Sequence, residues 1–430
     1  LHEKVGNIMK LIKKLMPVIL VCIMVVSVIA CGGIDKDDKD KEIEKLDIET
    51  PVTINVWYDN KDYERYLNTI SESVKSANKL VTVNPVYIDT QDMIDTIYTE
   101  TVRNDNGPDV YLMSSEVCDK AYLLGLMLEN DSYGDIYNEQ VYGNAAIKAC
   151  SYKGRLYGYP VSFEMPVMVY NKQYAEPIDS YEKLKQLSDS HTVTESNQNI
   201  SRVFDFDASD MLLNYPYIGR YMDIGGDEAE DAAVFTINEQ YFKQAVKEYS
   251  ALKTAFGIDR SESTKDVCID EFTQNKLMYT IVNTGDLKKI DDSGVSYGII
   301  PVPYLSEGLE SVPMSVTTMA VVNPYTSNIS VAKAVARAIS YDYAEDIQSL
   351  SSHVSARADM TKKGKKADNT DYNTLHDIYS DSIVKAKYIG VQNIYTRYEI
   401  LLHQVWDGRN VDEAYNEFYK SVESYMTYSK

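Results

Sequence analysis

The 430-residue sequence lacks the short motifs of the commonest enzyme chemistries. It contains no HExxH zinc motif, no GxGxxG dinucleotide fingerprint and no P-loop. Its histidines are few and scattered, at positions 2, 191, 353, 376 and 403. We therefore expect no metal, no cofactor and no enzymatic activity, although missing motifs alone do not exclude an enzyme.

Cysteine and tryptophan are also scarce. Two of the five cysteines lie near the N-terminus, and the other three, Cys118, Cys150 and Cys268, have neither CxxC nor metal-ligand spacing. The sequence is compatible both with one disulfide among these three cysteines and with three buried thiols. The aromatic residues are 36 tyrosines against 8 phenylalanines and 2 tryptophans. Because tyrosine joins an apolar ring to a hydroxyl, we expect most to pack in the protein and a few to line a wet pocket.

Positive charge is in short supply. Lysine and arginine number 43 against 65 aspartates and glutamates, which gives a formal net charge of −22. This balance argues against a nucleic-acid partner, because proteins that bind nucleic acids present basic surfaces. Hydrophobic residues make up 44% and charged residues 25%, an ordinary globular composition.

The one long apolar run lies near the N-terminus and is too short to span a membrane comfortably. It covers residues 15–30, whereas a transmembrane helix needs roughly 20 residues. Three lysines precede it: Lys10, Lys13 and Lys14. A basic start followed by a short apolar run is typical of a secretory signal. We predict a signal peptide over 1–30, with translation from Met9 and residues 1–8 not translated.

Cys31 lies on the boundary between this apolar run and a charged segment. The residues Val28-Ile29-Ala30-Cys31 resemble a bacterial lipobox, in which the cysteine becomes the lipid-bearing N-terminus. Residues 35–49 carry mixed charge and cannot bury a core, so 31–51 is expected to be a disordered tether. Acyl chains hold a membrane by burying methylenes, at about 0.8 kcal/mol each. We therefore predict a lipid at Cys31 that holds the protein on the extracytoplasmic face of a bacterial cell membrane.

Strand-like and helix-like patterns alternate along the rest of the chain. Residues 52–57 alternate with period two, and 62–78 places apolar residues on one helical face. Further strands are expected at 81–88, 109–113, 277–282, 296–300 and 317–322, further helices at 92–103 and 330–341, and loops at 188–201 and 356–374. The pattern predicts an α/β fold with mostly parallel sheets, and the 400 residues from Cys31 onward predict two lobes.

Several short motifs follow one another in a familiar order. They are Gly-Pro-Asp-Val at 107–110, Gly-Arg-Leu-Tyr-Gly-Tyr-Pro at 154–160, Tyr-Asn-Lys at 170–172, Glu-Phe-Thr-Gln-Asn-Lys at 271–276, Tyr-Gly-Ile-Ile-Pro-Val-Pro at 297–303, Val-Asn-Pro at 322–324 and Gly-Arg-Asn-Val-Asp-Glu-Ala at 408–414. Together they resemble the extracellular solute-binding proteins of sugar ABC importers, the maltose/maltodextrin-binding group in particular, and the likeness spans about 52–425.

The resemblance implies a two-lobe periplasmic-binding-protein-like fold with a hinge and an interlobe ligand cleft. It places 52–163 and 316–365 in an N-terminal lobe, and 164–315 and 366–430 in a C-terminal lobe. The implied function is a monomeric lipoprotein that captures a carbohydrate and delivers it to ABC permease membrane subunits. Hinge closure excludes water, which strengthens each polar contact to the solute.

In the first lobe, the family's motif places ligand-binding residues at Trp57, Asp59 and Glu116. Trp57 as core filler at a strand end, and Glu116 as the cap of a helix near Val117, are equally open readings. Met113 falls where the family carries a stacking tryptophan. Its absence indicates a solute other than maltose itself.

Six further residues complete the implied site. Glu164 matches a glutamate beside the hinge, where pairing with a basic neighbour is the alternative. On the second lobe the motif implies Asp210 as a hydroxyl acceptor, Tyr215 or Tyr217 as a stacking ring, Asn283 on a cleft loop, and Tyr395 as another aromatic. Two family tryptophans are absent, which favours an oligosaccharide pocket with weaker stacking.

Two other functions stay open at this point. A surface adhesin or structural lipoprotein shares the anchor but gives no reason for the hinge motifs. An extracellular glycosidase using Glu164 and Asp210 requires two carboxyls at about 5–10 Å and an acid of raised pKa.

Overall fold

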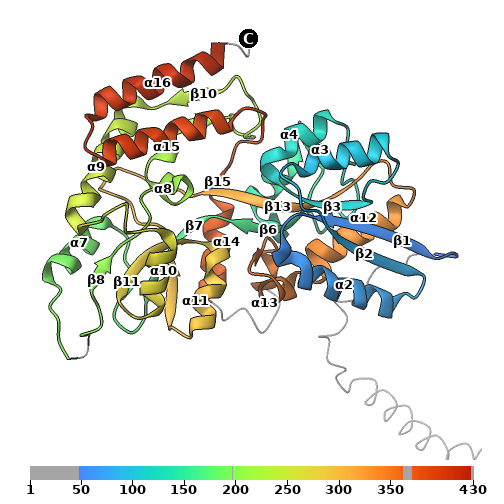
Figure 1. Cartoon of the computed structure of the whole chain (residues 1–430), viewed down its shortest axis with the longest axis horizontal. Coiled ribbons are helices and arrows are strands. Elements are labelled where there is room, and N and C mark those ends of the chain that lie inside the picture. Colours follow the sequence, from blue (N-terminus) through green and yellow to red (C-terminus); the bar gives the residue numbers. More distant parts are fainter. Residues whose placement is uncertain (1–47, 196, 362–369, 428–430) are drawn as a thin grey trace, which may run out of the picture. The chain divides into compact units, whose positions relative to one another are not determined.

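The computed structural model describes residues 48–195, 197–361 and 370–427 (Figure 1). The signal, Cys31 and nearly all of the tether lie outside these residues. Among the residues described, no helix combines the length and the apolar character that crossing a bilayer requires. Cys118, Cys150 and Cys268 are buried and free, which matches the reading of three buried thiols.

The first sheet has seven strands in the order β14-β6-β13-β3-β1-β2, with β15 paired to β13. Their bounds are β1 Val52–Tyr58, β2 Val81–Tyr87, β3 Val110–Ser114, β6 Tyr159–Glu164, β13 Met314–Val322, β14 Val354–Ser355 and β15 Ile383–Val384. Strand β1 pairs parallel with β2 and β3, whereas β13 pairs antiparallel with β3 and β6. The sheet is therefore mixed, which corrects the expectation of a mostly parallel one.

The second sheet has four strands in the order β12-β7-β11-β8. Their bounds are β7 Pro166–Asn171, β8 Arg202–Phe204, β11 Leu277–Asn283 and β12 Tyr297–Ile300. Strand β7 pairs antiparallel with both β11 and β12. Two small hairpins complete the strands: β4 Ser151–Tyr152 with β5 Arg155–Leu156, and β9 Met222–Ile224 with β10 Phe235–Ile237.

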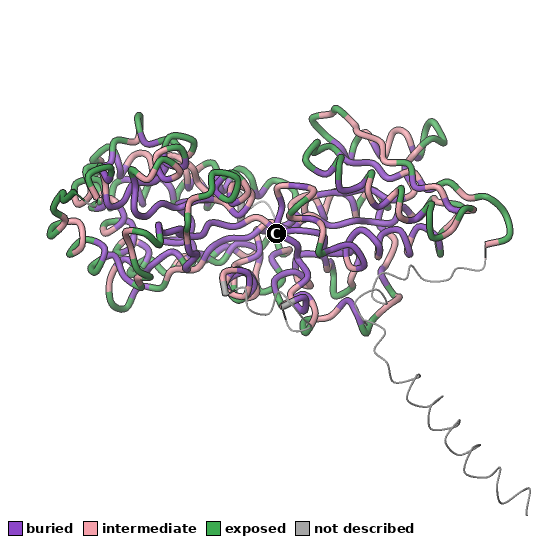
Figure 2. Tube along the Cα trace, turned by 90° about the horizontal axis from the view of Figure 1, so that it is seen from below, coloured by how far each residue is buried: buried purple, intermediate pink, exposed green. Residues whose placement is uncertain are grey.

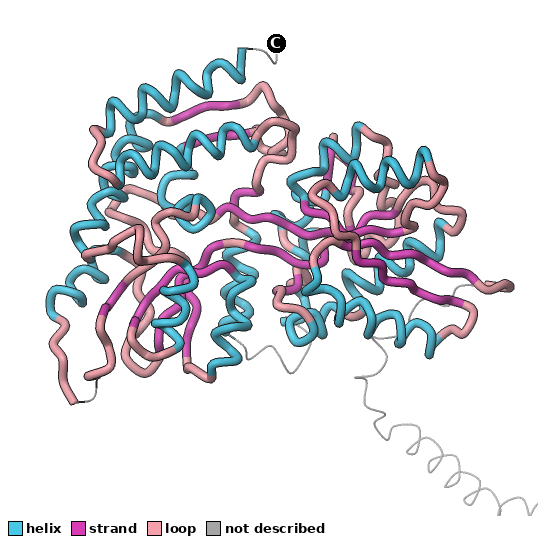
Figure 3. The backbone as a smooth tube through the Cα atoms, viewed as in Figure 1, coloured by secondary structure: helices cyan, strands magenta, loops and turns pink. Residues whose placement is uncertain are grey.

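The chain passes directly from one sheet to the other between β6 and β7. Only Met165 separates Glu164, the last residue of β6, from Pro166, the first of β7, and Met165 is fully buried. The long strand β13 then returns to the first sheet, as the ribbon in Figure 3 shows. The lobe boundaries given above stay a prediction.

Helices cover both faces of the first sheet because its strands alternate. Val56 of β1 packs in one apolar cluster with α2 (Glu64–Ala77) and α12 (Ile329–Arg337), whereas Trp57 packs in another with α3 (Met93–Tyr98) and α4 (Cys118–Leu123). Successive strand residues point to opposite faces, so both faces need apolar cover. Figure 1 shows α3 and α4 on one side of the sheet and α2 on the other.

The remaining helices pack around the two sheets and the hairpins. They are α5 Glu139–Tyr142, α6 Asn144–Cys150, α7 Tyr181–Ser190, α8 Met211–Ile218, α9 Glu239–Phe256, α10 Lys265–Thr273, α11 Leu287–Ser293, α13 Ile347–Leu350, α14 Thr370–Ser380, α15 Gln392–Trp406 and α16 Val411–Thr427. Short 3₁₀ or π segments include η2 Lys61–Tyr63, η3 Thr99–Arg103, η4 Ser115–Val117, η5 Gly219–Tyr221, η6 Thr284–Asp286, η7 Ala338–Asp342, η8 Ala344–Asp346 and η9 Asp359–Thr361. Figure 2 shows buried residues running through the interior and exposed residues mostly along the periphery.

Local patterns located most of these elements, with one clear error. Helix α2 begins two residues after the expected start and buries Tyr66, Ile70 and Val74 as expected. The loop predicted over 356–374 is wrong from Thr370 onward, where α14 begins. The turn-by-turn apolar spacing of Leu375 and Tyr379 was the missed signal, because both are buried.

Candidate functional site

Three acidic side chains meet where strands of the two sheets end. Glu116 follows β3, Glu164 ends β6 and Asp286 follows β11. The other two carboxylates both contribute to the electrostatic environment of Glu164. We call Glu116, Glu164 and Asp286 the carboxylate cluster. Open α/β sheets bind ligands beyond the carboxyl ends of their strands. The carboxylate cluster therefore lies where a ligand site is expected in this class of fold.

Glu164 is the least compensated member of the cluster. Its side chain is 47% exposed and lies above Gly285, where an added Cβ would stand 3.2 Å from Oε1. Desolvation raises the pKa of Glu164, and Asp286 adds to this, whereas Lys265 opposes it. No lysine or arginine of the described chain lies within ion-pair distance of Glu164 in the structure. The sequence analysis gave pairing of Glu164 with a basic neighbour as the alternative to ligand binding. Among the described residues, His353 is the one such neighbour within 4 Å.

The other two members of the cluster each have a lysine. Lys385, just after β15, forms an ion pair with Glu116, and Ser114 Oγ donates to Glu116 Oε2 at 3.2 Å. Lys265 Nζ lies 3.2 Å from Asp286 Oδ1. These pairs place hydrogen-bond donors and acceptors side by side, an arrangement suited to a solute rich in hydroxyl groups.

The structure brings some of the expected site residues to the cluster and leaves others away from it. Asn283 lies beside it, because its backbone N–H donates to Asp286 Oδ2 at 3.1 Å. Tyr395 touches it through Lys385, whose Nζ lies 5.3 Å from the ring centroid. Asp59 is exposed at the end of β1, and desolvation raises its pKa.

The four aromatic residues expected to bind a solute are all core residues in this structure. Trp57 is 7% exposed, and Tyr215, Tyr217 and Tyr395 are each 1% exposed. The Tyr217 and Tyr181 hydroxyls bond to each other, while the Tyr395 hydroxyl accepts the Ala386 N–H at 3.1 Å. A buried ring presents no face to a sugar, so these placements correct the expectation of stacking and leave core packing as the observed role.

Asp210 is engaged in a local helix cap. Its Oδ1 accepts the backbone N–H groups of Leu212 and Leu213 at 2.8 and 3.1 Å, at the start of α8. An aspartate at this position satisfies donors that would otherwise lack partners. The structure thus gives Asp210 Oδ1 a capping role, and the expected hydroxyl contact stays a prediction.

Sequence reasoning missed the two lysines and the histidine beside the cluster. Lys385 follows the two-residue strand β15, and His353 is an isolated histidine that precedes the two-residue strand β14. Neither has a local pattern that marks it. Asp286, by contrast, lies three residues after Asn283, in the segment 283–286 that follows from the cleft loop implied by the motif.

The family model of the bacterial extracellular solute-binding proteins matches residues 69–333, more than half of the chain. The chain belongs to this family. Among curated relatives of this solute-binding protein is the maltodextrin-binding protein MdxE of Bacillus subtilis (strain 168), 22% identical over 376 residues, or 84% of each chain.

Solved structures of similar fold carry the same architecture at low identity. An extracellular solute-binding protein from Staphylococcus aureus in complex with maltose matches with a TM-score of 0.72 at 17% identity, over 87% of this chain and 99% of that one. A cyclo/maltodextrin-binding protein complexed with maltotetraose matches with a TM-score of 0.71 at 15% identity, over 88% and 98%. These matches confirm the two-lobe binding-protein fold.

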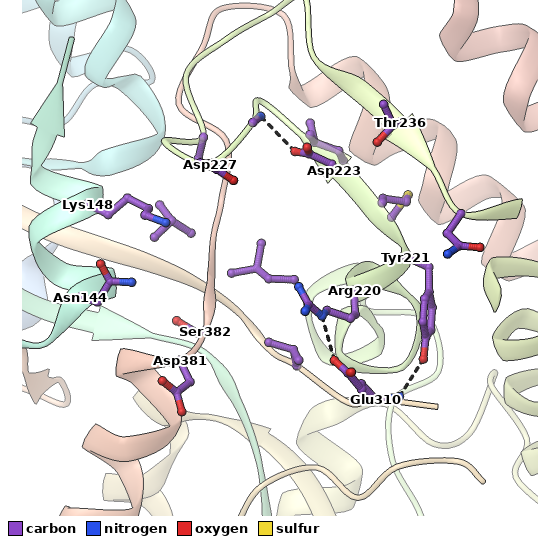
Figure 4. A pocket seen from close by; sticks show the side chains of 18 of the residues that line it. Asn144, Lys148, Arg220, Tyr221, Asp223, Asp227, Thr236, Glu310, Asp381 and Ser382 are labelled. Atoms are coloured by element: carbon purple, nitrogen blue, oxygen red, sulfur yellow. Dashed lines mark hydrogen bonds and ion pairs between the residues drawn. The ribbon is translucent and has the colours of Figure 1, made fainter. Parts of the chain in front are cut away.

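Figure 4 shows a groove of this solute-binding protein that no residue of the carboxylate cluster lines. Its volume is about 950 Å³, and α6, η5, β9, β10, β15 and the end of α14 line it. None of the nine expected ligand residues lines it. Arg220 and Glu310 pair within it at 2.9 Å, so its most prominent cation is already engaged. Strand ends and a carboxylate without a lysine or arginine ion pair coincide at the carboxylate cluster instead, which makes the cluster the candidate site.

One serine motif in the sequence has the wrong structural setting for catalysis. Residues 294–298 read Gly-Val-Ser-Tyr-Gly, a GxSxG pattern. A nucleophile elbow requires a strand-to-helix turn, whereas here α11 ends and β12 begins. The histidine and acid of a triad are not found among the hydrogen-bond partners of Ser296 in the described chain, so the pattern carries no hydrolase assignment.

Proposed function

We propose that this solute-binding protein captures a carbohydrate, most simply an oligosaccharide, and delivers it to an ABC permease without transforming it. The observation that carries the proposal is the carboxylate cluster, in which Glu164 has no lysine or arginine within ion-pair distance and accompanies two lysine–carboxylate pairs. The relatives named above that are maltodextrin-binding or carry maltose and maltotetraose support the solute class.

Each polar group of the cluster has a role in this proposal. Glu164 accepts hydroxyl protons of the sugar, while Glu116 with Lys385 and Asp286 with Lys265 offer acceptors and donors to neighbouring hydroxyls. A buried hydroxyl left unpaired costs about 1–3 kcal/mol, so such a site selects solutes whose hydroxyls match its partners. Asp59 and Asn283 are proposed to contact the solute at the edge of the cluster.

The burial of the four aromatic rings bears on which sugar binds. Without Trp57, Tyr215, Tyr217 or Tyr395 presenting a face, binding rests on polar contacts. We therefore propose an oligosaccharide other than maltose as the preferred solute, as the missing tryptophans also suggest.

A glycosidase is disfavoured because the family model that matches more than half of the chain describes solute-binding proteins. Asp210 also caps α8 through Oδ1, a structural role that accounts for it without the Glu164–Asp210 mechanism. An adhesin or structural lipoprotein gives no reason for lysine-paired carboxylates at strand ends of two sheets.

The anchor is a separate part of the proposal. We propose that Cys31 carries lipid and that the protein works as a monomer on the extracytoplasmic face of the membrane. Mass spectrometry of the native N-terminal peptide tests it: an acylated Cys31 is expected, and an unmodified peptide spanning Ala30 and Cys31 contradicts it.

Calorimetry against a panel of malto-, cello-, xylo- and manno-oligosaccharides tests the solute class. We expect binding of at least one glycan, and a loss of about tenfold or more in Glu164→Gln, because one buried hydrogen bond to a charged group is worth about 1.5–3 kcal/mol. Glu72→Gln, at an exposed position of α2, is the matched control and is expected to bind normally. Binding of amino acids or polyamines but of no glycan overturns the sugar assignment.

A further inference from the structure

His353 is a buried histidine that lies against the proposed solute-binding glutamate. It immediately precedes β14 and is 5% exposed. Its ring stacks on Tyr63 at a centroid distance of 4.4 Å and an interplanar angle of 10°. The Tyr63 hydroxyl in turn bonds to Ser162 Oγ at 2.6 Å, so the stack is held in place. The His353 Nδ1 atom makes no hydrogen bond and lies 3.8 Å from Glu164 Oε1.

Asn60 determines which ring nitrogen of His353 carries the proton. The Asn60 Oδ1 atom accepts the backbone N–H of Asp62 at 3.0 Å, which fixes the orientation of the amide. The Asn60 Nδ2 atom therefore faces His353 Nε2, at 3.3 Å. An amide nitrogen only donates, so Nε2 must be the accepting, unprotonated nitrogen. The neutral ring then carries its proton on Nδ1, on the side of Glu164.

We propose that Asn60 and His353 form a relay that holds an N–H toward Glu164, which makes His353 a positioning residue for the solute-binding carboxylate. The inference rests on the proposed function for the role of Glu164. Glu164 lacks a lysine or arginine partner, and a fixed N–H dipole beside it favours its ionised form, the form that accepts sugar hydroxyls. The distance of 3.8 Å from His353 Nδ1 to Glu164 Oε1 is too long for a hydrogen bond, so the N–H acts on the carboxylate through its dipole. Rotation of the half-exposed Glu164 side chain shortens this distance.

The groups around the pair are consistent with a neutral imidazole. Glu164 is faced by Asp62 from η2, Glu116 from η4, Asp286 from η6 and Lys265 from α10. Desolvation lowers the pKa of His353, against an opposite contribution from Asp62. Protonation of Nε2 would also set two donors, the ring N–H and the Asn60 amide, against each other. His353 thus acts through its dipole at neutral pH.

Three variants separate the relay from a packing role. His353→Phe keeps a ring on Tyr63 but removes the N–H, so the pKa of Glu164 should rise by about 0.5 or more. His353→Asn restores an N–H at the position of Nδ1 and should return the pKa of Glu164 toward that of the wild type. Asn60→Asp, at an exposed position, supplies an acceptor to Nε2, so the neutral ring should carry its proton on Nε2 and turn the lone pair of Nδ1 toward Glu164. The pKa of Glu164 should then rise, as in His353→Phe.

Nuclear magnetic resonance of the full-length protein, with ¹⁵N-labelled histidine and ¹³C-labelled glutamate carboxyls, measures these quantities without a ligand. The expected result is an Nδ1–H tautomer of His353 in the wild type, an Nε2–H tautomer in Asn60→Asp, and a raised pKa of Glu164 in both His353→Phe and Asn60→Asp. An Nε2–H tautomer in the wild type, or a pKa of Glu164 unchanged in both variants, overturns the relay. If His353→Phe does not fold, Asn60→Asp alone decides, because it leaves the core intact.

Calorimetry with maltotetraose and the glycan panel then separates the two proposals. Weaker glycan binding by His353→Phe, restored in His353→Asn, supports the positioning role, and equal affinity in all three proteins contradicts it. Expected pKa shifts together with no glycan binding by the wild type leave the His353–Glu164 coupling in place and remove the sugar assignment.

Discussion

Lys385 and Glu116 form an ion pair between the segment that follows β15 and the segment that follows β3. The pair is partly sheltered, since the lysine side chain is 13% exposed and the glutamate 32%. Lys385 also lies over the ring of Tyr395, so a single cation connects the carboxylate cluster to the aromatic core of α15. The site and the core are thus coupled through one side chain.

Replacing Lys385 with methionine should weaken both stability and binding. The apolar stem is kept, but Glu116 loses its cation, which should cost about 2 kcal/mol of unfolding free energy, the value of a hydrogen bond to a charged group. Urea denaturation and calorimetry measure the two effects. Lys288→Met removes a partly exposed lysine that pairs with the exposed Asp292 within one helix, and it serves as control because such surface pairs contribute well under 1 kcal/mol. Equal losses in both variants would contradict a special role for Lys385.

Solute affinity should fall as the pH is lowered through the pKa of Glu164, which desolvation places above its ordinary value of 4.5. Protonation removes an acceptor from the cluster. The effect on stability has the opposite sign: because the folded-state pKa is raised, ionised Glu164 destabilises the fold, so this destabilisation is relieved as the pH falls through that pKa. Calorimetry and denaturation from pH 4.5 to 8 measure both, and Glu164→Gln should remove both dependences. A pH-independent affinity in the wild type would count against Glu164.

Substitution of Asp210 distinguishes a capping role from a binding role. Asp210→Ala should lower the unfolding free energy by about 1 kcal/mol through loss of the cap, whereas Asp210→Asn should keep the cap. Neither variant should change solute affinity. A tenfold loss of affinity in Asp210→Asn at unchanged stability would instead return Asp210 to the binding site.

His376 should make the protein less stable in mild acid. Both of its ring nitrogens are buried without hydrogen-bond partners, and burial lowers its pKa to about 3 from an ordinary 6.5. Below pH 6.5 His376 binds a proton in the unfolded chain, whereas the buried side chain of the folded protein stays neutral. Stability should therefore fall toward pH 3, by at most about 1.4 kcal/mol per pH unit from this one group.

His376→Phe tests this assignment. The side chain lies among the rings of Phe163 and Tyr372, so phenylalanine suits the site and removes the titration. The variant should be as stable as the wild type at pH 7 and more stable at pH 5, as measured by urea denaturation. An identical pH dependence in both proteins would exclude His376 as the cause.

Local periodicity located the elements of the fold because each needs only its own residues. The strand at 52–58 and the helix at 64–77 follow from side-chain spacing, whatever lies beside them. The same reasoning failed for sheet direction, because whether β13 runs parallel or antiparallel to β3 depends on the path of the chain between them. It also failed for α14, whose pattern starts inside a polar segment.

The candidate site was only partly predictable for a related reason. Motif order led to Glu116, Glu164 and the segment 283–286, all of which the structure brings together. It also led to Tyr215 and Tyr395, because a motif position gives the residue type but not what covers it. In the fold, α8 and α15 pack these two rings against each other, with centroids 6.5 Å apart.

The amino-acid sequence by itself determined the order of strands and helices, the family motifs and an excess of carboxylates without enough cations to neutralise them. Tertiary structure alone decided which carboxylates have a cationic partner. Lys385 pairs with Glu116 and Lys265 with Asp286, whereas the basic neighbour of Glu164 is the histidine His353. The reason is physical: backbone spacing is set by neighbours along the chain, whereas ionisation and hydrogen bonding are set by neighbours in space.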